Sequence, residues 1–453
     1  MRAKEAARAA GTASRARQGY LAVLVTVALV ASACTSSTAP ANPPRTTANA
    51  PTSAQPWPRS FASSLLTGVT SVDALSCATA ADCSAVAVGT TGRTPGAGAT
   101  TTTTTATSVG PVLLTTTDGG GRWTRSAAPS PISFLSDLSC PTTWCVAAGQ
   151  ELTGSGPTGV FVVRAGPTAT WSTVGAPGGV TDVTTLTCLA DQWCLAVGTS
   201  AFGPLALVST DAGRSWALQG PLRNGAMSAT SVSCTSPTAC WAATYESSQP
   251  DHATGTVLAT SDGGATWVPT TALPSGTGIV SAVACTPATS PPPGTPAAGG
   301  VGAGAGTSAS STTGSSTTTG SSTTTTVPAT SPAVPDGNCV VAGTTGTTFG
   351  DPRVGSAVLL TSSDGGASWT PQAIGSSIAS LTSVSCPTSS ACVAAGSTTA
   401  TTPQAGVLVL TGGDGQPWAS ARTQLVPEAP VALSCPALGH CLGAGGPVLE
   451  RLG

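Results

Sequence analysis

Short apolar runs, separated by turns rich in Gly, Asp and Thr, recur along the chain between residues 57 and 453. In each repeat, a β-branched piece ends at a Cys, and a second run such as Val86–Gly89 follows another Cys. A third run, such as Val112–Leu114, ends in a turn, after which a Trp opens a fourth extended piece. Such runs, bounded by turn residues, are typical of β-strands. The pattern therefore predicts a repeating unit of four short strands.

A series of Trp residues marks the period of this unit. Consecutive members are 45 to 51 residues apart, except for one gap of 102: Trp123, Trp171, Trp216, Trp267, Trp369 and Trp418. A four-stranded unit at this period is typical of a β-propeller blade. We therefore expect an all-β fold built from four-stranded antiparallel blades.

Fourteen of the fifteen cysteines form consecutive pairs, one in each predicted unit. Even numbers at regular spacing are typical of disulfides in proteins outside the cytoplasm. The alternative, zinc binding, usually needs two to four residues between ligands and an accompanying His or second Cys pair, which this pattern lacks. The pairs expected to form disulfides are Cys77–Cys83, Cys140–Cys145, Cys188–Cys194, Cys234–Cys240, Cys285–Cys339, Cys386–Cys392 and Cys435–Cys441.

The turn before the Trp carries a motif of the form Ser/Thr-x-Asp-Gly-Gly-x-x-Trp, with Ala for the first Gly in one copy. Four good copies contain Asp118 and Trp123, Asp211 and Trp216, Asp262 and Trp267, and Asp364 and Trp369. Two degraded copies precede Trp171 and Trp418. The motif resembles the Asp-box (BNR) repeat of sialidase-like and photosystem II assembly-factor-like propellers. That resemblance implies a structural role: Asp accepts turn amide hydrogens, Gly permits positive φ, and Trp fills the gap beside the next blade.

Seven Cys pairs predict seven blades, but residues 431–453 supply too few strands for a complete one. Residues 56–61 resemble the segments that begin at Trp267 and Trp369, where fourth strands start. We therefore predict a seven-bladed propeller over residues 57–453, in which an N-terminal strand completes the last blade and removes an exposed sheet edge. The composition of the insertion at 286–338, rich in Pro, Gly, Ser and Thr, predicts disorder.

The N-terminus reads as a secretory signal over residues 1–33. Basic residues precede an apolar run, Leu21 to Ala31, that is short for a membrane span. Residues 30–34, Val-Ala-Ser-Ala-Cys, resemble the lipobox of bacterial lipoproteins, with Ala31 where Leu is usual. The resemblance implies lipidation of Cys34, a tether over residues 34–56, and anchoring to the outer face of the bacterial cell membrane. The alternative is an ordinary signal peptide with an unmodified Cys.

Charge and composition argue against some classes of function. Without residues 1–33, 11 basic residues face 17 acidic ones, a net charge of −6. No basic stripe is present, which argues against nucleic-acid binding, and two His and two Tyr leave little for acid–base chemistry. We expect a monomeric, non-catalytic binding module for an envelope protein, peptide or glycan, with no metal or cofactor.

Ligands of such propellers usually bind on the face opposite the disulfides. On that face, two neighbouring loops differ from the otherwise bland connections. The candidate residues are Tyr245, Glu246, Asp251 and His252 in the fourth blade, and Phe349, Asp351 and Arg353 in the fifth. The alternative is a pair of solvated loops without a ligand.

A second function, glycoside hydrolysis, is also considered. A sialidase-like site needs three Arg, a Tyr nucleophile with a nearby Glu, and an acidic proton donor. Tyr245 and Glu246 are adjacent in sequence, which is the wrong relation, and no residues stand out as the two carboxylates that other glycosidases set across a cleft.

Overall fold

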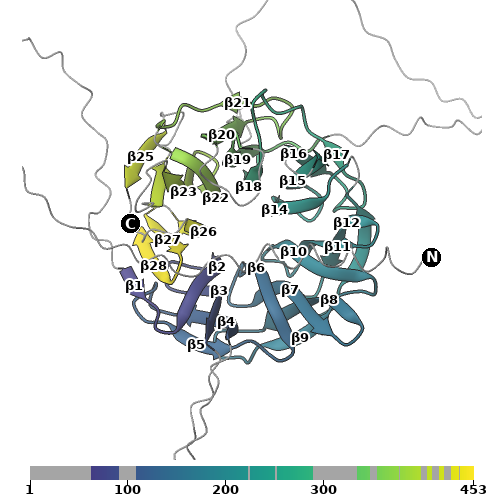
Figure 1. Ribbon diagram of the computed structural model, residues 1–453, viewed down its shortest axis with the longest axis vertical. Coiled ribbons are helices and arrows are strands. Elements are labelled where there is room, and N and C mark those ends of the chain that lie inside the picture. The colour runs from purple at the N-terminus through teal and green to yellow at the C-terminus, as the bar shows by residue number, and fades with distance from the viewer. Residues whose placement is uncertain are drawn as a thin grey trace, which may run out of the picture. The chain divides into compact units, whose positions relative to one another are not determined.

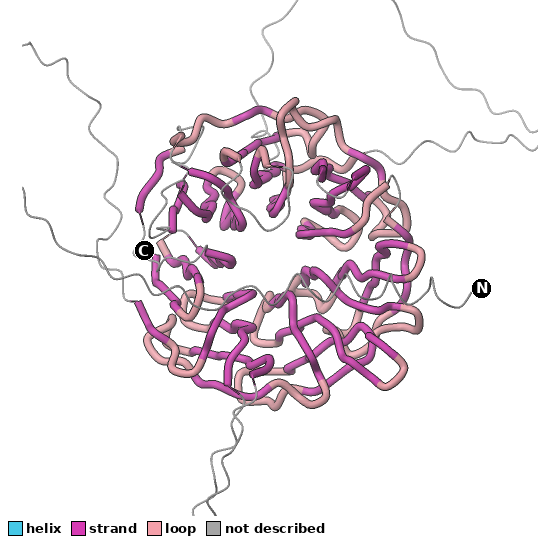
Figure 2. The backbone as a smooth tube through the Cα atoms, in the orientation of Figure 1, coloured by secondary structure: helices cyan, strands magenta, loops and turns pink. Residues whose placement is uncertain are grey.

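The computed structural model describes residues 63–90, 109–222, 225–249, 252–288, 334–346, 355–376, 378–398, 406–410, 418–422, 430–437 and 439–452. The chain separates into two units, residues 1–55 and 56–453, and every described residue belongs to the second. The predicted signal, the lipobox with Cys34, the tether and most of the 286–338 insertion lie outside the described residues. Across the described ranges the secondary structure is strand alone (Figure 2), so they include no helix that could span a membrane.

The strands form seven four-stranded antiparallel sheets, which we number as blades. Blades 1 to 3 contain β2 (Val69–Cys77), β3 (Cys83–Thr90), β4 (Val109–Thr116) and β5 (Thr124–Ala127); β6 (Ile132–Ser139), β7 (Cys145–Thr153), β8 (Gly156–Arg164) and β9 (Ser172–Gly175); and β10 (Val180–Cys188), β11 (Cys194–Ser200), β12 (Gly203–Ser209) and β13 (Ala217–Pro221). Blades 4 and 5 contain β14 (Ser228–Cys234), β15 (Cys240–Gln249), β16 (His252–Thr260) and β17 (Val268–Pro269); and β18 (Val280–Thr286), β19 (Asn338–Thr344), β20 (Ala357–Ser362) and β21 (Thr370–Pro371). Blade 6 contains β22 (Ile378–Thr388), β23 (Ala391–Thr398), β24 (Gly406–Leu410) and β25 (Ala419–Arg422), and blade 7 contains β26 (Pro430–Ala437), β27 (His440–Gly445), β28 (Val448–Leu452) and β1 (Ser63–Leu65).

The blades follow one another around a central axis, with the first strand of each blade innermost (Figure 1). Innermost strands of successive blades contact each other, and β26 of blade 7 contacts β2 of blade 1. This arrangement confirms the predicted all-β propeller of four-stranded antiparallel blades.

Blade 7 combines strands from the two extremes of the described chain, and purple β1 lies beside yellow β28 in Figure 1. Their antiparallel register places Ser63 opposite Glu450 and Leu65 opposite Val448. The sequence placed the N-terminal strand at residues 56–61, which lie outside the described residues. The observed pairing with β28 lies slightly later in the chain, at residues 63–65.

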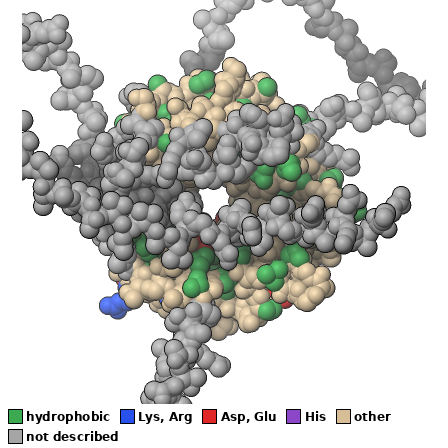
Figure 3. All heavy atoms as spheres, viewed as in Figure 1, with side chains coloured by type: hydrophobic (Ala, Val, Ile, Leu, Met, Phe, Trp, Pro, Cys, Tyr) green, Lys and Arg blue, Asp and Glu red, His purple; other side chains and the backbone are tan. Residues whose placement is uncertain are grey.

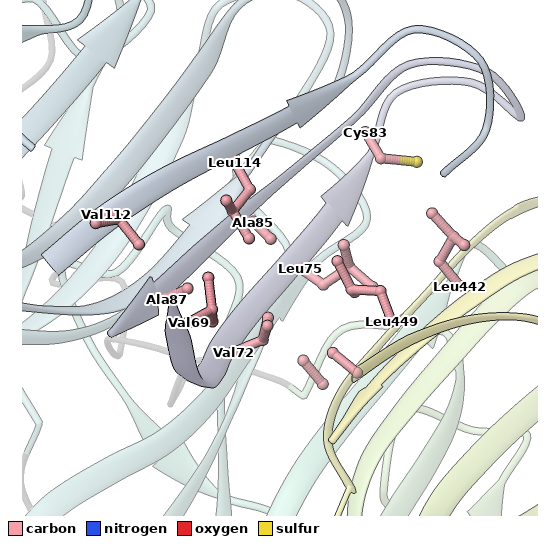
Figure 4. Packing of buried hydrophobic residues seen from close by; sticks show 12 residues of the cluster. Val69, Val72, Leu75, Cys83, Ala85, Ala87, Val112, Leu114, Leu442 and Leu449 are labelled. Atoms are coloured by element: carbon pink, nitrogen blue, oxygen red, sulfur yellow. The ribbon is translucent and has the colours of Figure 1, made fainter. Parts of the chain in front are cut away.

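Each hydrophobic core cluster joins two neighbouring blades because successive side chains of a strand point to opposite faces of its sheet. In β8, Val162 packs toward blade 1 and Phe161 toward blade 3. Figure 4 shows the cluster between blades 7 and 1, where Leu75 lies close to Leu442 and Leu449. The cores between the blades therefore hold successive blades together.

The motif Trp residues contribute to these cores, but the expected contact with the next blade is wrong. Each packs against the preceding blade: Trp123 joins the core with blade 7, and Trp216 stacks on Phe161 of blade 2 with ring centroids 3.9 Å apart. The Trp directly precedes the fourth strand, and its side chain lies on the face of the sheet that packs against the preceding blade. Trp267 and Trp369 follow the same rule.

All seven predicted cysteine pairs are disulfides. Each disulfide connects the first and second strands of one blade, close to the turn between them. We call this end of every blade the disulfide end, and the opposite end, where the second strand turns into the third, the loop end.

A serine latch joins neighbouring blades at the disulfide end. The hydroxyl of Ser76, the residue before the first Cys of blade 1, accepts a hydrogen bond of 2.9 Å from the backbone N–H of Cys140 in blade 2. Ser434 of blade 7 accepts the same bond, also 2.9 Å, from Cys77 of blade 1. Five of the seven blade junctions contain this bond, at 2.9–3.1 Å, with Ser76, Ser139, Ser233, Ser385 and Ser434 as acceptors.

The four motif turns share one hydrogen-bond network. The hydroxyl of Thr116 donates to Asp118 Oδ1 and accepts from the N–H of Gly120, while the N–H of Arg122 donates to the same carboxylate. The same three bonds, at 2.7–2.9 Å, occur in the turns at residues 209–216, 260–267 and 362–369. These Asp oxygens therefore accept hydrogen bonds within their own turns.

Candidate binding surface

The structure describes part of the predicted ligand loops. Tyr245 and Glu246 lie near the loop end of β15, and β16 begins at His252, which pairs with Gln249. The remaining candidates lie outside the described residues: Asp251, Phe349, Asp351 and Arg353. The predicted meeting of the fourth and fifth blades' loops therefore stays a prediction.

Tyr245 and Glu246 do not form a convergent pair. They are consecutive residues of a regular strand, with Tyr245 opposite Gly255 and Glu246 opposite Thr254. Consecutive side chains of a strand point to opposite faces, so these two groups cannot act together on one sugar as nucleophile and partner. Within the described ranges, no group of three His, Cys, Asp or Glu could hold a metal ion.

Exposed hydrophobic side chains gather at the loop end. Phe202, in the turn between β11 and β12, is 100% exposed, and Leu152, beside the turn between β7 and β8, is 61% exposed. Five of the six exposed large hydrophobic side chains among the described residues lie at this end, namely Val109, Phe134, Leu152, Phe202 and Met227. Leu218, on the outermost strand of blade 3, is the sixth. Blades 1 to 4 therefore each present an exposed hydrophobic side chain at the loop end, and we call those in blades 2 to 4 the apolar rim: Phe134, Leu152, Phe202 and Met227.

The strand register places these residues at one end. Phe134 is opposite Gln150, two positions before Leu152, so both lie far from the Cys140–Cys145 disulfide. The N–H of Met227 donates to the carbonyl of Tyr245, near the loop end of β15. The apolar rim thus shares its end of the propeller with the predicted ligand residues of blade 4.

Sequence reasoning missed the apolar rim because its search was for charged or catalytic side chains. One signal was present: Phe202 stands between Ser200 and Gly203, where a tight turn usually carries polar residues or Gly. A Phe at such a turn position is therefore the one feature of the sequence that points to this surface.

Carboxylates accompany the apolar rim. Glu151 precedes Leu152, and Glu246 and Asp182 lie near the loop ends of blades 4 and 3. Burial raises the pKa of Asp182, although a hydrogen bond from the backbone N–H of Val183 acts in the opposite direction. The Oδ1 atom of Asp182 is buried without a hydrogen-bond partner among the described residues. No described Arg or Lys of blades 2 to 4 lies at this end. The surface is therefore apolar with acidic groups.

The disulfide end has a different character. The four motif Asp residues serve their own turns, and few charged side chains are visible among the described residues in the view of Figure 3. Hydrogen bonds, first from the hydroxyl of Ser368, lower the pKa of Asp364 to about 2. A carboxyl with so low a pKa cannot serve as a general acid near neutral pH.

Blade 2 replaces the motif with a buried arginine. Arg164 lies opposite Cys145, the register that Thr116 has opposite Cys83, and is 7% exposed. Its Nη2 donates to Ser84 Oγ of blade 1 at 3.0 Å, and its guanidinium lies 4.9 Å from the ring centroid of Trp171. Burial lowers the pKa of Arg164. The arginine therefore links blades 1 and 2 where the Asp turn is lost.

Comparison with known proteins gives the fold. No protein-family model matches the chain, and no curated protein matches it. Among solved structures, "YCF48 bound to D1 peptide" is 12% identical, with 86% of this chain and 94% of that chain covered, at a TM-score of 0.50. YCF48 from Cyanidioschyzon merolae is 12% identical over 86% of this chain and 98% of that one, at 0.47. A Hadza microbial sialidase is 11% identical over 80% and 66%, at 0.42. At 12% identity and a TM-score of 0.50, the similarity to the first of these structures shows a shared β-propeller fold.

Proposed function

We propose that this protein is a non-catalytic binding module and that the loop end of blades 2 to 4 is its binding surface. The partner is a protein segment or peptide that carries apolar side chains next to Lys or Arg. The observation that carries this proposal is the apolar rim, in which Phe202 is fully exposed, together with Glu151, Glu246 and Asp182 at the same end of the propeller.

Hydrophobic surface and charge together select the partner class. Exposed apolar patches on soluble domains mark interaction sites, and large apolar side chains are common anchors of binding energy. Glu151, Asp182 and Glu246 favour a cationic partner by charge complementarity and disfavour anionic ones. The structure of YCF48 bound to D1 peptide is an example of a propeller of this fold with a bound peptide.

Rigidity supports a binding role. Disulfides, serine latches and motif turns hold the blades at the disulfide end. At the loop end, side-chain hydrogen bonds join neighbouring blades, such as the bond of 3.2 Å from Gln150 Nε2 to the carbonyl of Thr181. We further propose that the seven blades form a ring that β1 closes, which removes the free edge of blade 7. A preorganised surface loses less conformational entropy on binding.

We also propose that the protein is a lipoprotein of the outer face of the bacterial cell membrane, anchored through Cys34. Seven disulfides support a location outside the cytoplasm. Mass spectrometry of the N-terminal peptide tests the anchor. The expected result is a diacylated Cys34, with release from membranes in Cys34→Ala; an unmodified Cys34 contradicts the proposal.

A panel of synthetic peptides of equal length tests the binding surface. One peptide combines Leu and Phe with Lys and Arg, a second combines Leu and Phe with Glu, and a third has Lys and Arg without large apolar residues. Isothermal titration calorimetry should show the tightest binding for the first. Phe202→Ser and Leu152→Ser should each weaken it about tenfold or more, since buried anchors contribute at least 1.4 kcal/mol.

Leu218→Ser is the matched control for Leu152→Ser, because Leu218 is 54% exposed, close to the 61% of Leu152, but lies outside the apolar rim. Equal loss of affinity in Leu218→Ser, or full affinity in Phe202→Ser, contradicts the proposed surface. The enzyme alternative is tested with fluorogenic sialosides and other glycosides. Turnover by the wild type that Glu246→Gln abolishes would replace the binding module with a hydrolase.

A further inference from the structure

A cavity of about 170 Å³ lies at the disulfide end between blade 7 and blade 1. We call this blade junction the seam and the space the seam cavity. Blade 1 contributes residues of its disulfide turn and Gly119 to the lining. Blade 7 contributes Pro436, residues 439–442 and Arg451. His440 and Arg451 line the cavity, and no Asp or Glu does.

The cavity exists because blade 7 is assembled differently from the others. In blade 1, the motif turn covers the disulfide turn, with the N–H of Gly119 donating to the carbonyl of Ala81 at 2.8 Å. In blade 7 the fourth strand is β1, so no motif turn joins it to β28. Leu452 lies opposite Cys441. In blade 1 the corresponding position, opposite Cys83, is Thr116, where the motif turn begins. The Cys435–Cys441 turn therefore lacks this cover in the described structure.

Two side-chain hydrogen-bond donors at the seam have no acceptor among the described residues. Arg451 reaches across it, since a Cβ atom placed on Gly119 would lie 3.0 Å from Nη2 of Arg451. No hydrogen bond or ion pair connects this guanidinium to another described side chain. The indole Nε1 of Trp123, in the same blade junction, is buried without a partner, whereas those of Trp216 and Trp267 donate to backbone carbonyls at 3.1 Å.

We propose that the seam cavity binds an oxyanion, either a carboxylate or a tetrahedral anion such as sulfate. A planar guanidinium binds carboxylate and tetrahedral oxyanions through paired, charge-assisted hydrogen bonds. The cavity has room for such a group, and the lining contains no carboxylate to repel it. An anion there contacts both blade 1 and blade 7, and so stabilises the junction of the two chain extremes by linkage.

Calorimetric titration of the full-length protein with sodium sulfate, sodium acetate and sodium chloride at constant ionic strength tests the proposal. Sulfate or acetate should bind saturably at one site per chain, and chloride should not compete at equal concentration. Arg451→Gln should weaken oxyanion binding at least tenfold, and His440→Gln should weaken it less. The sulfate and acetate arms distinguish a tetrahedral ligand from a carboxylate.

Arg122→Gln is the matched control, because Arg122 is an exposed arginine of the blade 1 motif turn that does not line the cavity. It should leave the affinity unchanged. Sulfate also stabilises proteins by exclusion from their surface, so a thermal shift counts as support where Arg451→Gln removes it. Absence of saturable binding by wild type, or equal binding by Arg451→Gln with an unchanged circular dichroism spectrum, overturns the proposal.

Discussion

Ser and Thr hydroxyl groups at the disulfide end make two kinds of hydrogen bond in this protein. The hydroxyls of the motif turns, such as that of Ser362, bond within one turn, while those of the serine latches bond between blades. Both kinds sit next to a disulfide, so a buried or half-buried backbone N–H at each place has a partner. An unpaired buried N–H costs about 1–3 kcal/mol, which makes these small side chains important to stability.

Asp364→Asn tests the motif turn through its pH dependence. The pKa of Asp364 is lowered from 3.8 to about 2 in the folded protein, so the ionised carboxylate stabilises the folded state above its unfolded pKa. That contribution is lost as the pH falls from about 4 to about 2. In denaturant titrations, the destabilisation of Asp364→Asn relative to wild type should be largest above pH 4 and shrink toward pH 2. A difference that stays constant over this range contradicts the assignment.

Ser434→Ala tests the serine latch at the seam. It leaves the N–H of Cys77 without its acceptor and should lower the free energy of unfolding by about 1–3 kcal/mol. Blade 5 offers the reverse experiment, because Ala284 occupies the latch position there. Ala284→Ser should raise the melting temperature or leave it unchanged. Stability that does not fall in Ser434→Ala argues against the latch.

The latches also mark a limit of sequence reasoning. A Ser precedes the first Cys in five units of the sequence, and the local pattern predicts only that this Ser belongs to a strand. Its bonding partner lies 49 to 64 residues away, or 357 for Ser434. Local patterns predicted the turns and, from the regular pairing of Cys residues, the disulfides, whose partners are near in sequence except for Cys285 and Cys339. They did not predict bonds that depend on how blades stack.

At the scale of the strand and turn, each blade is a disulfide-bonded hairpin with two further strands. The disulfides were predictable because the two Cys end one strand and begin the next. The packing direction of Trp was not, because the side of the sheet on which a Trp lies depends on strand register and twist. The apolar rim was missed for a related reason: exposure of Phe202 and Leu152 is a property of the folded loop end.

Removal of individual disulfides should have unequal effects. The Cys285–Cys339 bridge spans 54 positions and the Cys77–Cys83 bridge spans 6. In the chain-entropy model, the longer loop contributes about 4 kcal/mol and the shorter about 2 kcal/mol. Double Cys→Ala variants compared by chemical denaturation should show this order. An equal loss in the two variants would indicate that local packing, rather than loop length, sets the contribution.

At the scale of the whole propeller, we expect stability to depend on the seam. The core between blades 7 and 1, the Ser434 latch and the β1–β28 pairing all join residues from opposite ends of the described chain. The sequence predicted an N-terminal strand in the last blade from a repeated Trp-x-Pro pattern. It did not predict the position of the pairing, because three residues of backbone pairing carry no distinctive side chains.

Stepwise truncation tests this seam. A chain that starts at Ser63 retains every described pair of β1, whereas one that starts at Leu66 loses all three. The second should melt several degrees lower than the first and associate more, because β28 becomes an exposed sheet edge. Differential scanning calorimetry with light scattering measures both effects. Equal melting of the two chains contradicts a stabilising role of β1.

The pairing of β1 with β28 has a consequence for how the gene can be arranged. The two strands are antiparallel neighbours, so a tight turn like that at residues 362–369 can link Leu452 to Ser63. A circular permutant can then begin at another blade boundary, for example at Val180, and still contain every strand pair. The described strand pairs therefore do not require that the chain begin in blade 7.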